Sequence, residues 1–269
     1  MKVIVRDDDT CGFTQVDELN ACYTDIWGEI PISLSVTPYR IPGTDRNLTG
    51  ELAGSMDIMP LHENVELVDF LRRSLQDGQV DVSMHGYHHL RYNGLPEYVG
   101  GSDLERKTLE GKAYLDNLLS TSVVTFVPPN NVISLDAIGV VTKAGMNLVN
   151  VPSIWGRVFH GGRMPDVSQL LEFYLHRKVR NRQYRYILDM GNHKEVGFHT
   201  VGPRSKRKML FEEMNYCHER DGVFVLAAHY HAFPRKTDDG ESVKTLLFDL
   251  IDKAVGMSGV EFVGINSIW

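Results

Sequence analysis

The chain has 269 residues, of which 42% are hydrophobic and 23% are charged, proportions that are ordinary for a soluble globular protein. Its net charge of −7 gives no general attraction to nucleic acid or to an anionic membrane, so neither partner is expected. Three cysteines are too few for a disulfide framework and favour a reducing, cytoplasmic location.

Short apolar strands alternate with longer helical patterns along the chain. A strand over 2–6 is followed by helical spacing over 16–27, a strand over 31–36 and an amphipathic helix over 63–75. The later elements continue this order: a strand at 80–84, a helix at 104–119 with Ser102 as its expected N-cap, a strand at 122–127, a helix at 135–143, a strand at 146–151, a helix at 167–175, a strand at 195–201, a helix at 205–220, a strand at 222–228, a helix at 242–255 and a strand at 260–265.

Seven or eight strand–helix repeats without internal duplication predict an α/β fold, a distorted parallel (β/α) barrel. The run 222–228 is almost entirely apolar, which is typical of a strand buried on both faces. Segment 152–194 breaks the rhythm, and we interpret it as an excursion from the barrel. Because no linker or low-complexity tract is visible, a single domain over residues 1–269 is expected. No apolar run approaches the roughly 20 residues needed to span a bilayer.

Polar side chains gather where several predicted strands end. Asp7, Asp8 and Asp9 end the first strand, the block 85–89 with His85, His88 and His89 ends the third, and His229 and His231 follow the strand at 222–228. In parallel barrels the strand ends meet at one mouth, so these groups should share a site. Carboxylates and imidazoles together suit a divalent metal such as zinc, iron or cobalt. A helical turn would bring His85 and His89 onto one face.

This ordered set resembles the polysaccharide deacetylase superfamily, also called NodB-like or carbohydrate esterase family four. The likeness runs from about residue 4 to residue 231, and its motifs are adjacent aspartates, a His-x-x-x-His, a proline pair at 128–129 and a histidine after a late apolar strand. The resemblance implies a distorted seven-stranded (β/α) barrel that uses a divalent metal, commonly zinc, to remove acyl groups from amino sugars.

Carried over by position, the resemblance implies that Asp9, His85 and His89 bind the metal. It implies that Asp8 is the general base for the attacking water and that His229 protonates the leaving amine. Zinc is the favoured ion, and iron, cobalt and nickel are alternatives.

The register of the aspartates stays open, because the extra Asp7 permits a shift of one residue. Alternation along a strand would put Asp7 and Asp9 on one side and Asp8 on the other. The family often has an arginine after strand four that orients its catalytic aspartate. This sequence has none there, and Arg6 is the candidate replacement.

Further residues are assigned supporting roles. His88 and Asp7 are expected to lie behind the ligands and hold their orientation. His231 is an alternative to His229 as the acid, since the two are two residues apart and would point to the same side of a strand. The candidate substrate contacts are Asn130, His199, His231 and Tyr87.

The leading hypothesis is a metal-dependent carbohydrate N-deacetylase that acts on an N-acetyl or N-formyl amino sugar. A small glycan precursor is the expected substrate, and the basic group Arg204–Lys208 is a candidate contact for its phosphates. A metal-containing, carbohydrate-binding barrel without turnover and an amidohydrolase-type metal hydrolase are the alternatives. A homo-oligomer is compatible with the sequence.

Overall fold

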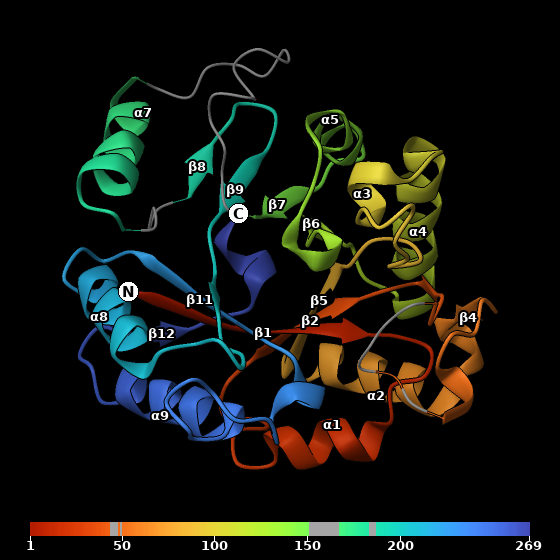
Figure 1. Cartoon of the computed structure of the whole chain (residues 1–269), viewed down its shortest axis with the longest axis horizontal. Coiled ribbons are helices and arrows are strands. Elements are labelled where there is room, and N and C mark those ends of the chain that lie inside the picture. The colour runs from red at the N-terminus through yellow and green to blue at the C-terminus, as the bar shows by residue number, and fades with distance from the viewer. Residues whose placement is uncertain (44–47, 49, 151–166, 183–186) are drawn as a thin grey trace.

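The computed structural model describes residues 1–43, 48, 50–150, 167–182 and 187–269. A largely parallel sheet runs through the molecule in the order β10-β11-β1-β2-β5-β6-β7-β9-β8 (Figure 1). Its strands are β1 (Lys2–Thr10), β2 (Ile32–Val36), β5 (Val80–Met84), β6 (Thr125–Phe126), β7 (Asn147–Val149), β8 (Leu188–Asp189), β9 (Lys194–Val196), β10 (His199–Thr200) and β11 (Val223–Ala228). A further strand, β12 (Glu261–Phe262), pairs with the start of β1.

One stretch of chain closes this row of strands into a barrel. β9 pairs with β7, placing Glu195 opposite Leu148, whereas β10 pairs with β11, placing His199 opposite Leu226. The β9–β10 stretch therefore touches both ends of the row β11-β1-β2-β5-β6-β7. If β9 and β10 are counted together as one strand of the barrel, the barrel is a distorted one of seven parallel strands. The predicted fold class is confirmed.

Helices pack around the outside of this barrel (Figure 1). They are α1 (Val16–Tyr23), α2 (Val65–Gln76), α3 (Glu97–Gly100), α4 (Leu104–Leu119), α5 (Leu135–Lys143), α8 (Arg207–His218) and α9 (Val243–Val255), and a further helix, α7 (Val167–Tyr174), lies apart from them in Figure 1. Side-chain caps begin three of them: Asn64 accepts the N–H of Leu67, Ser134 that of Ala137, and Ser242 that of Thr245. α7 continues into a π-helical turn over Leu175–Val179.

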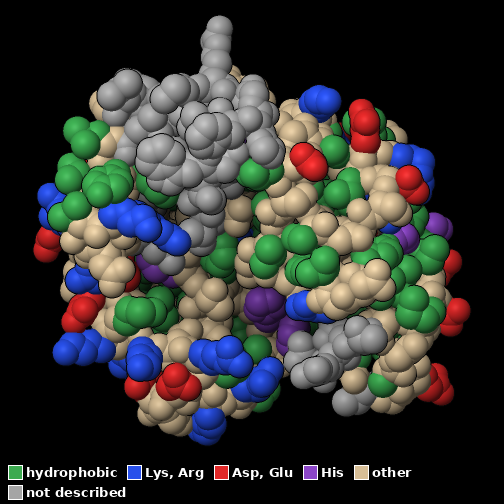
Figure 2. Space-filling view, turned by 45° about the horizontal axis from the view of Figure 1, so that its top comes forward, with side chains coloured by type: hydrophobic (Ala, Val, Ile, Leu, Met, Phe, Trp, Pro, Cys, Tyr) green, Lys and Arg blue, Asp and Glu red, His purple; other side chains and the backbone are tan. Residues whose placement is uncertain are grey.

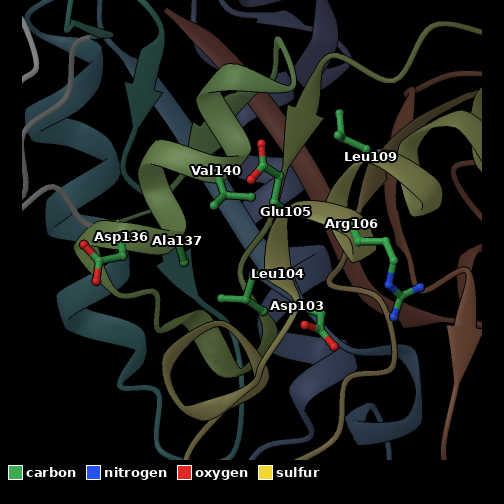
Figure 3. Close-up of a pocket in the computed structure, with 8 residues that line it drawn as sticks. All are labelled: Asp103, Leu104, Glu105, Arg106, Leu109, Asp136, Ala137 and Val140. Carbon is green, nitrogen blue, oxygen red and sulfur yellow. The ribbon is translucent and has the colours of Figure 1, made fainter.

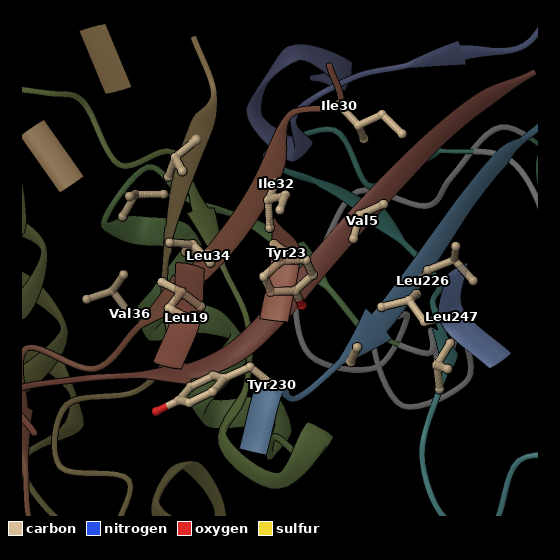
Figure 4. Packing of buried hydrophobic residues seen from close by; sticks show 14 of the residues in the cluster. Val5, Leu19, Tyr23, Ile30, Ile32, Leu34, Val36, Leu226, Tyr230 and Leu247 are labelled. Carbon is tan, nitrogen blue, oxygen red and sulfur yellow. The ribbon is translucent and has the colours of Figure 1, made fainter. Parts of the chain in front are cut away.

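The strands bury both of their faces. Outward side chains such as Val5, Leu34 and Leu226 pack with the helices in the larger hydrophobic cluster (Figure 4). Inward side chains form a smaller cluster inside the barrel, made of Ile4, Val127, Val149, Val196, Phe198, Val225, Ala227, Ile265 and Ile268. This alternation decides which side chains of each strand can reach the barrel mouth.

A short 3₁₀ helix, Ile265–Ile268, fills the floor of the barrel. The N–H of Ile265 donates to Ser33 Oγ at 2.9 Å, and the N–H of Asn266 donates to Asp81 Oδ2 at 2.7 Å. Ser33 and Asp81 lie near the beginnings of β2 and β5. The chemistry-bearing side chains gather at the other end of the barrel, where the strands finish.

Several boundaries differ from the prediction. Asp103, in a left-handed conformation with φ +56°, precedes α4, so the expected N-cap role of Ser102 is wrong. The expected strand 195–201 is divided into β9 and β10, and the short antiparallel pair β3 (Tyr39–Arg40) and β4 (Met59–Pro60) was not anticipated. Much of the predicted excursion, 151–166 and 183–186, lies outside the described residues. Within the described chain, no helix combines the length and apolarity needed to cross a bilayer.

Candidate functional site

The three aspartates at the end of β1 do not alternate regularly. The pairing of β1 with β2 shifts between Asp7 and Thr10, and Asp9 has a φ of +77°. This bulge turns Asp9 into the same cleft as Asp8. Asp7 instead lies on the outer face, where its carboxyl accepts a hydrogen bond from the Tyr23 hydroxyl. The predicted sharing of one side by Asp7 and Asp9 is therefore wrong, because a left-handed residue interrupts the period of two.

Asp9, His85 and His89 bring their donor atoms within 4.8 Å of one another. Asp9 Oδ1 lies 3.5 Å from His85 Nε2 and 3.2 Å from His89 Nε2. His85 Nδ1 lies 2.9 Å from the carbonyl oxygen of Val127, so a donated N–H there would leave Nε2 as the ligating atom. Asp9 Oδ1 is buried and has no hydrogen-bond partner among the described residues. One carboxylate and two imidazoles around such an atom fit a divalent cation.

A buried carboxylate holds the loop between the two histidines. Glu97 accepts the backbone N–H groups of Tyr87, His88 and His89 at distances of 2.9 to 3.0 Å. The loop enters this arrangement through Gly86, whose φ is +71°. A Cβ at Gly86 would lie 2.7 Å from Glu97 Oε2, so only glycine fits there without displacement. Sequence reasoning missed Glu97, because nothing in its local pattern marks it as a partner of backbone N–H groups.

Asp8 forms a buried ion pair with Arg6. Arg6 Nη2 donates to Asp8 Oδ2 at 2.8 Å and to Asn131 Oδ1 at 3.1 Å. The guanidinium also lies over the ring of Phe198, 4.5 Å from its centroid. Burial raises the pKa of Asp8, but the charges of Arg6, His85 and His229 outweigh burial and hold that pKa below its usual value. Asp8 is therefore ionised at neutral pH. Arg6 supplies the positive charge beside Asp8 that was expected of it in place of the missing arginine after the fourth strand.

The other site groups are held in the forms that bind cations. Burial raises the pKa of Asp9, yet His89, His85, His229 and Arg40 together keep it well below its usual value. Burial, and then the nearby Arg40, lower the pKa of His89 well below that of a free imidazole. An ionised Asp9 and a neutral His89 are the protonation states that metal ligation requires.

These groups open into a cleft of about 900 Å³ at the barrel mouth. In the space-filling view, histidine side chains gather near the middle of one face with a Lys or Arg side chain beside them (Figure 2). Besides Asp8, Asp9, His85 and His89, the polar lining comprises Arg91, Asn130, Asn131, Thr200, His229, His231 and Arg235.

Both histidines that follow β11 reach this cleft, as does Asn130. His229 Nε2 lies 3.6 Å from Asp9 Oδ2, and the rings of His229 and His231 are 5.3 Å apart. His229 is thus the nearer of the two to the proposed ligands. The Asn130 amide oxygen accepts a hydrogen bond from Arg91.

Two predicted substrate contacts, His199 and Tyr87, lie outside the cleft lining. His199 does not line the cleft; its ring stacks on Phe224 at 4.4 Å, because strand alternation points it outward and turns Thr200 inward. The expected substrate contact of His199 is therefore wrong. Tyr87 is also outside the lining, because its hydroxyl donates to Glu110 at 3.1 Å.

His88 makes a different contact from the one expected of it. Its Nδ1 lies 2.7 Å from the carbonyl oxygen of Tyr39 and not beside a ligand's ring. Among the described residues, the carbonyl of Val127 and the carboxylate of Glu97 hold the two ligand histidines instead. The orienting role predicted for His88 is corrected accordingly.

A second hollow, of about 760 Å³, lies between the starts of α4 and α5 (Figure 3). The residues that line it include Asp103 and Leu104 at the start of α4 and Asp136 and Ala137 at the start of α5 (Figure 3). Its described lining contains no histidine or cysteine and none of the aspartates of β1. It is therefore separate from the aspartate–histidine cluster.

Comparisons with known proteins agree with this fold. No family model and no curated protein matches the sequence. A Mycobacterium smegmatis protein provisionally named a polysaccharide deacetylase aligns with 99% of this chain and 88% of its own, with a TM-score of 0.59 and 12% identity. A 4-α-glucanotransferase from Thermococcus litoralis aligns with all of this chain and 40% of its own, with a TM-score of 0.54 and 11% identity.

At these identities the likeness shows the fold, and the predicted resemblance to polysaccharide deacetylases is confirmed at that level. The second structure carries a different chemistry in its name, so the fold alone does not select a reaction. The function has to be argued from the side chains at the barrel mouth.

Proposed function

We propose that this chain is a metal-dependent hydrolase that removes an N-acetyl or N-formyl group from an amino sugar or a sugar precursor. The observation that carries the proposal is the cluster of Asp9, His85 and His89 around one point, with the Asp8–Arg6 ion pair beside it. The deacetylase-like fold supports the same reading.

Asp9, His85 and His89 would hold the metal, and zinc is the favoured ion, with iron, cobalt and nickel as alternatives. When bound, such an ion supplies Lewis acidity that lowers the pKa of a water molecule and polarises an acyl carbonyl. Three protein ligands leave positions on the ion for water and substrate, as catalytic sites require.

Asp8 is the general base in this scheme. Arg6 engages Asp8 Oδ2, while Oδ1 accepts no hydrogen bond from the described residues. Ser35 also contributes a hydrogen bond that lowers the pKa of this carboxyl, and an ionised carboxylate that lines the cleft can take the proton of the attacking water on Oδ1. Arg6 keeps Asp8 charged and fixes the direction of that oxygen.

His229 is the general acid. Its ring lines the cleft and its side chain is 28% exposed, so a substrate nitrogen can reach it. Protonation of that nitrogen as the C–N bond breaks lets it leave as a neutral amine. His231, 5.3 Å away ring to ring, is the alternative donor.

The test is metal analysis followed by measurement of amine release from a panel of N-acetyl and N-formyl amino sugars. We expect stoichiometric metal, and a rate that falls about 10²-fold or more in Asp8→Asn and in His229→Ala. His88→Ala should retain the metal and serves as the control, because His88 lies outside the cleft lining. Stoichiometric metal with no amine release from any panel member would favour a binding barrel instead.

A further inference from the structure

Two arginines line the cleft from separate loops. Arg91 follows the loop 85–89 after β5, and Arg235 follows the short 3₁₀ helix Tyr230–Ala232 after β11. In the sheet, β1 and β2 lie between β5 and β11, so the two loops approach the cleft from different sides of the aspartates. Both arginine side chains are exposed at this mouth.

Arg91 is fixed in place without losing its charge. Its Nη1 donates to the carbonyl oxygen of Gly94 at 3.0 Å, and its Nη2 donates to the amide oxygen of Asn130. Both acceptors are neutral, and no described carboxylate forms an ion pair with Arg91. A guanidinium that is already oriented loses less conformational entropy when it binds an anion.

The formal charges of the described lining, from Asp8, Asp9, Arg91 and Arg235, cancel, whereas the chain as a whole carries a net charge of −7. Asp8 and Asp9 are the only carboxylates in its described lining, and the buried Arg6 already pairs with Asp8. A divalent ion at the ligands would add two further positive charges. A cleft that is less negative than the chain as a whole favours anions at this point over the rest of the surface.

We propose that the cleft selects N-acylated sugars that carry an anionic group, a phosphate or a carboxylate, which Arg91 and Arg235 bind. This inference rests on the proposed function for the identity of the sugar. Guanidinium groups match the oxygen geometry of both anions through paired hydrogen bonds. Arg204 and Lys208, members of the basic group considered for this role from the sequence, do not line the cleft.

The test measures binding by titration calorimetry at low salt with three probes: N-acetylglucosamine, N-acetylglucosamine 1-phosphate and N-acetylmuramic acid. The full chain is used as purified and again after treatment with a chelator. We expect at least one charged probe to bind about 10-fold or more tightly than the neutral sugar, in both states. The two charged probes distinguish a phosphate from a carboxylate as the recognised group.

Arg91→Gln and Arg235→Gln should each reduce the preference for the charged probe several-fold. Lys208→Gln makes the same charge change on an exposed residue outside the cleft and should leave the preference unaltered. Unchanged thermal unfolding would show that the variants are folded.

Equal affinity for all probes, or no measurable binding of either charged probe, would overturn the proposal. So would a preference that vanishes on chelation, because the metal alone would then be the anion site, or one that survives both arginine substitutions. The binding measurement does not depend on turnover. A failure of amine release would therefore count against the proposed hydrolase activity, while the binding result would still decide whether the cleft selects anionic sugars.

Discussion

The carboxylate of Glu97 accepts the backbone N–H of His89 at 3.0 Å and thereby positions a proposed metal ligand through its main chain. The same carboxylate accepts the N–H groups of Tyr87 and His88, so it spans the turn between His85 and His89. Glu97 is fully buried, and three donors that converge on one charged acceptor make a rigid arrangement.

We expect Glu97→Gln to weaken binding of zinc about 10- to 100-fold, because the amide N–H₂ would face backbone donors and disturb the turn. The affinity is measured by competition with a chromophoric chelator. Glu110→Gln is the matched control, since Glu110 contacts Tyr87 only through the phenol hydroxyl. Equal zinc affinity in wild type and Glu97→Gln would show that the turn holds without this carboxylate.

Arg6→Met should raise the pKa of Asp8, because it leaves that carboxylate buried without its partner. The acid limb of the kcat/KM profile should move to higher pH, and the protein should lose about 3 kcal/mol or more of stability. Asn131→Ala removes the other hydrogen bond of Arg6 and preserves the ion pair, so its acid limb should stay in place. An unshifted limb in an active Arg6→Met protein would remove Asp8 from the role of base.

The register of the aspartates can be tested by comparing Asp7→Asn with Asp9→Asn. Asp7 lies on the outer face, where it accepts the Tyr23 hydroxyl, and burial raises the pKa of its carboxyl well above its usual value, so the change to an amide should disturb the cleft less than the same change at Asp9. We expect Asp7→Asn to keep its metal and Asp9→Asn to lose it, as measured by elemental analysis after dialysis against dilute zinc. The reverse pattern would shift the ligand set by two residues.

Asp81 should make stability depend on pH in a direction opposite to that of the site carboxylates. Burial raises its pKa to about 6, whereas an unfolded aspartate titrates near ~3.9. As pH rises from about 4 to 8, the unfolded state loses this proton first, so the free energy of unfolding should fall by roughly 2 kcal/mol on account of Asp81. In Asp81→Asn this part of the decline should vanish from urea denaturation curves. A wild-type and variant pair with parallel pH profiles would contradict the assignment.

The barrel and the gathering of polar side chains at its mouth could be predicted from the sequence because both depend on short-range patterns. Strands with two buried faces are apolar throughout, and polar residues immediately after them mark the mouth. The pattern placed the aspartate triplet and the histidine block at one mouth, the resemblance to polysaccharide deacetylases singled out Asp9, His85 and His89 among them, and the structure brings these three together.

The remaining contacts depend on the path of the backbone, which periodicity does not describe. The bulge at Asp9 could not be seen, because an aspartate triplet gives no sign of which residue turns left-handed. His199 was misplaced because a single residue of register decides between the helix-covered face and the cleft. Glu97 was missed because its partners are backbone N–H groups of a separate loop, and Arg235 was missed because only the folded chain places it at the cleft.

Asp9 and His89 have φ values of +77° and +57°, in a region that residues other than glycine rarely occupy. An unfolded chain would seldom visit both torsions together, so the folded barrel bears their energetic cost. Replacing one divalent ion with another would then need no rebuilding of the loops. Under the proposed function, the fold fixes the geometry and the type of the ligands, and the supply of metal would act beside them in deciding which element occupies this mouth.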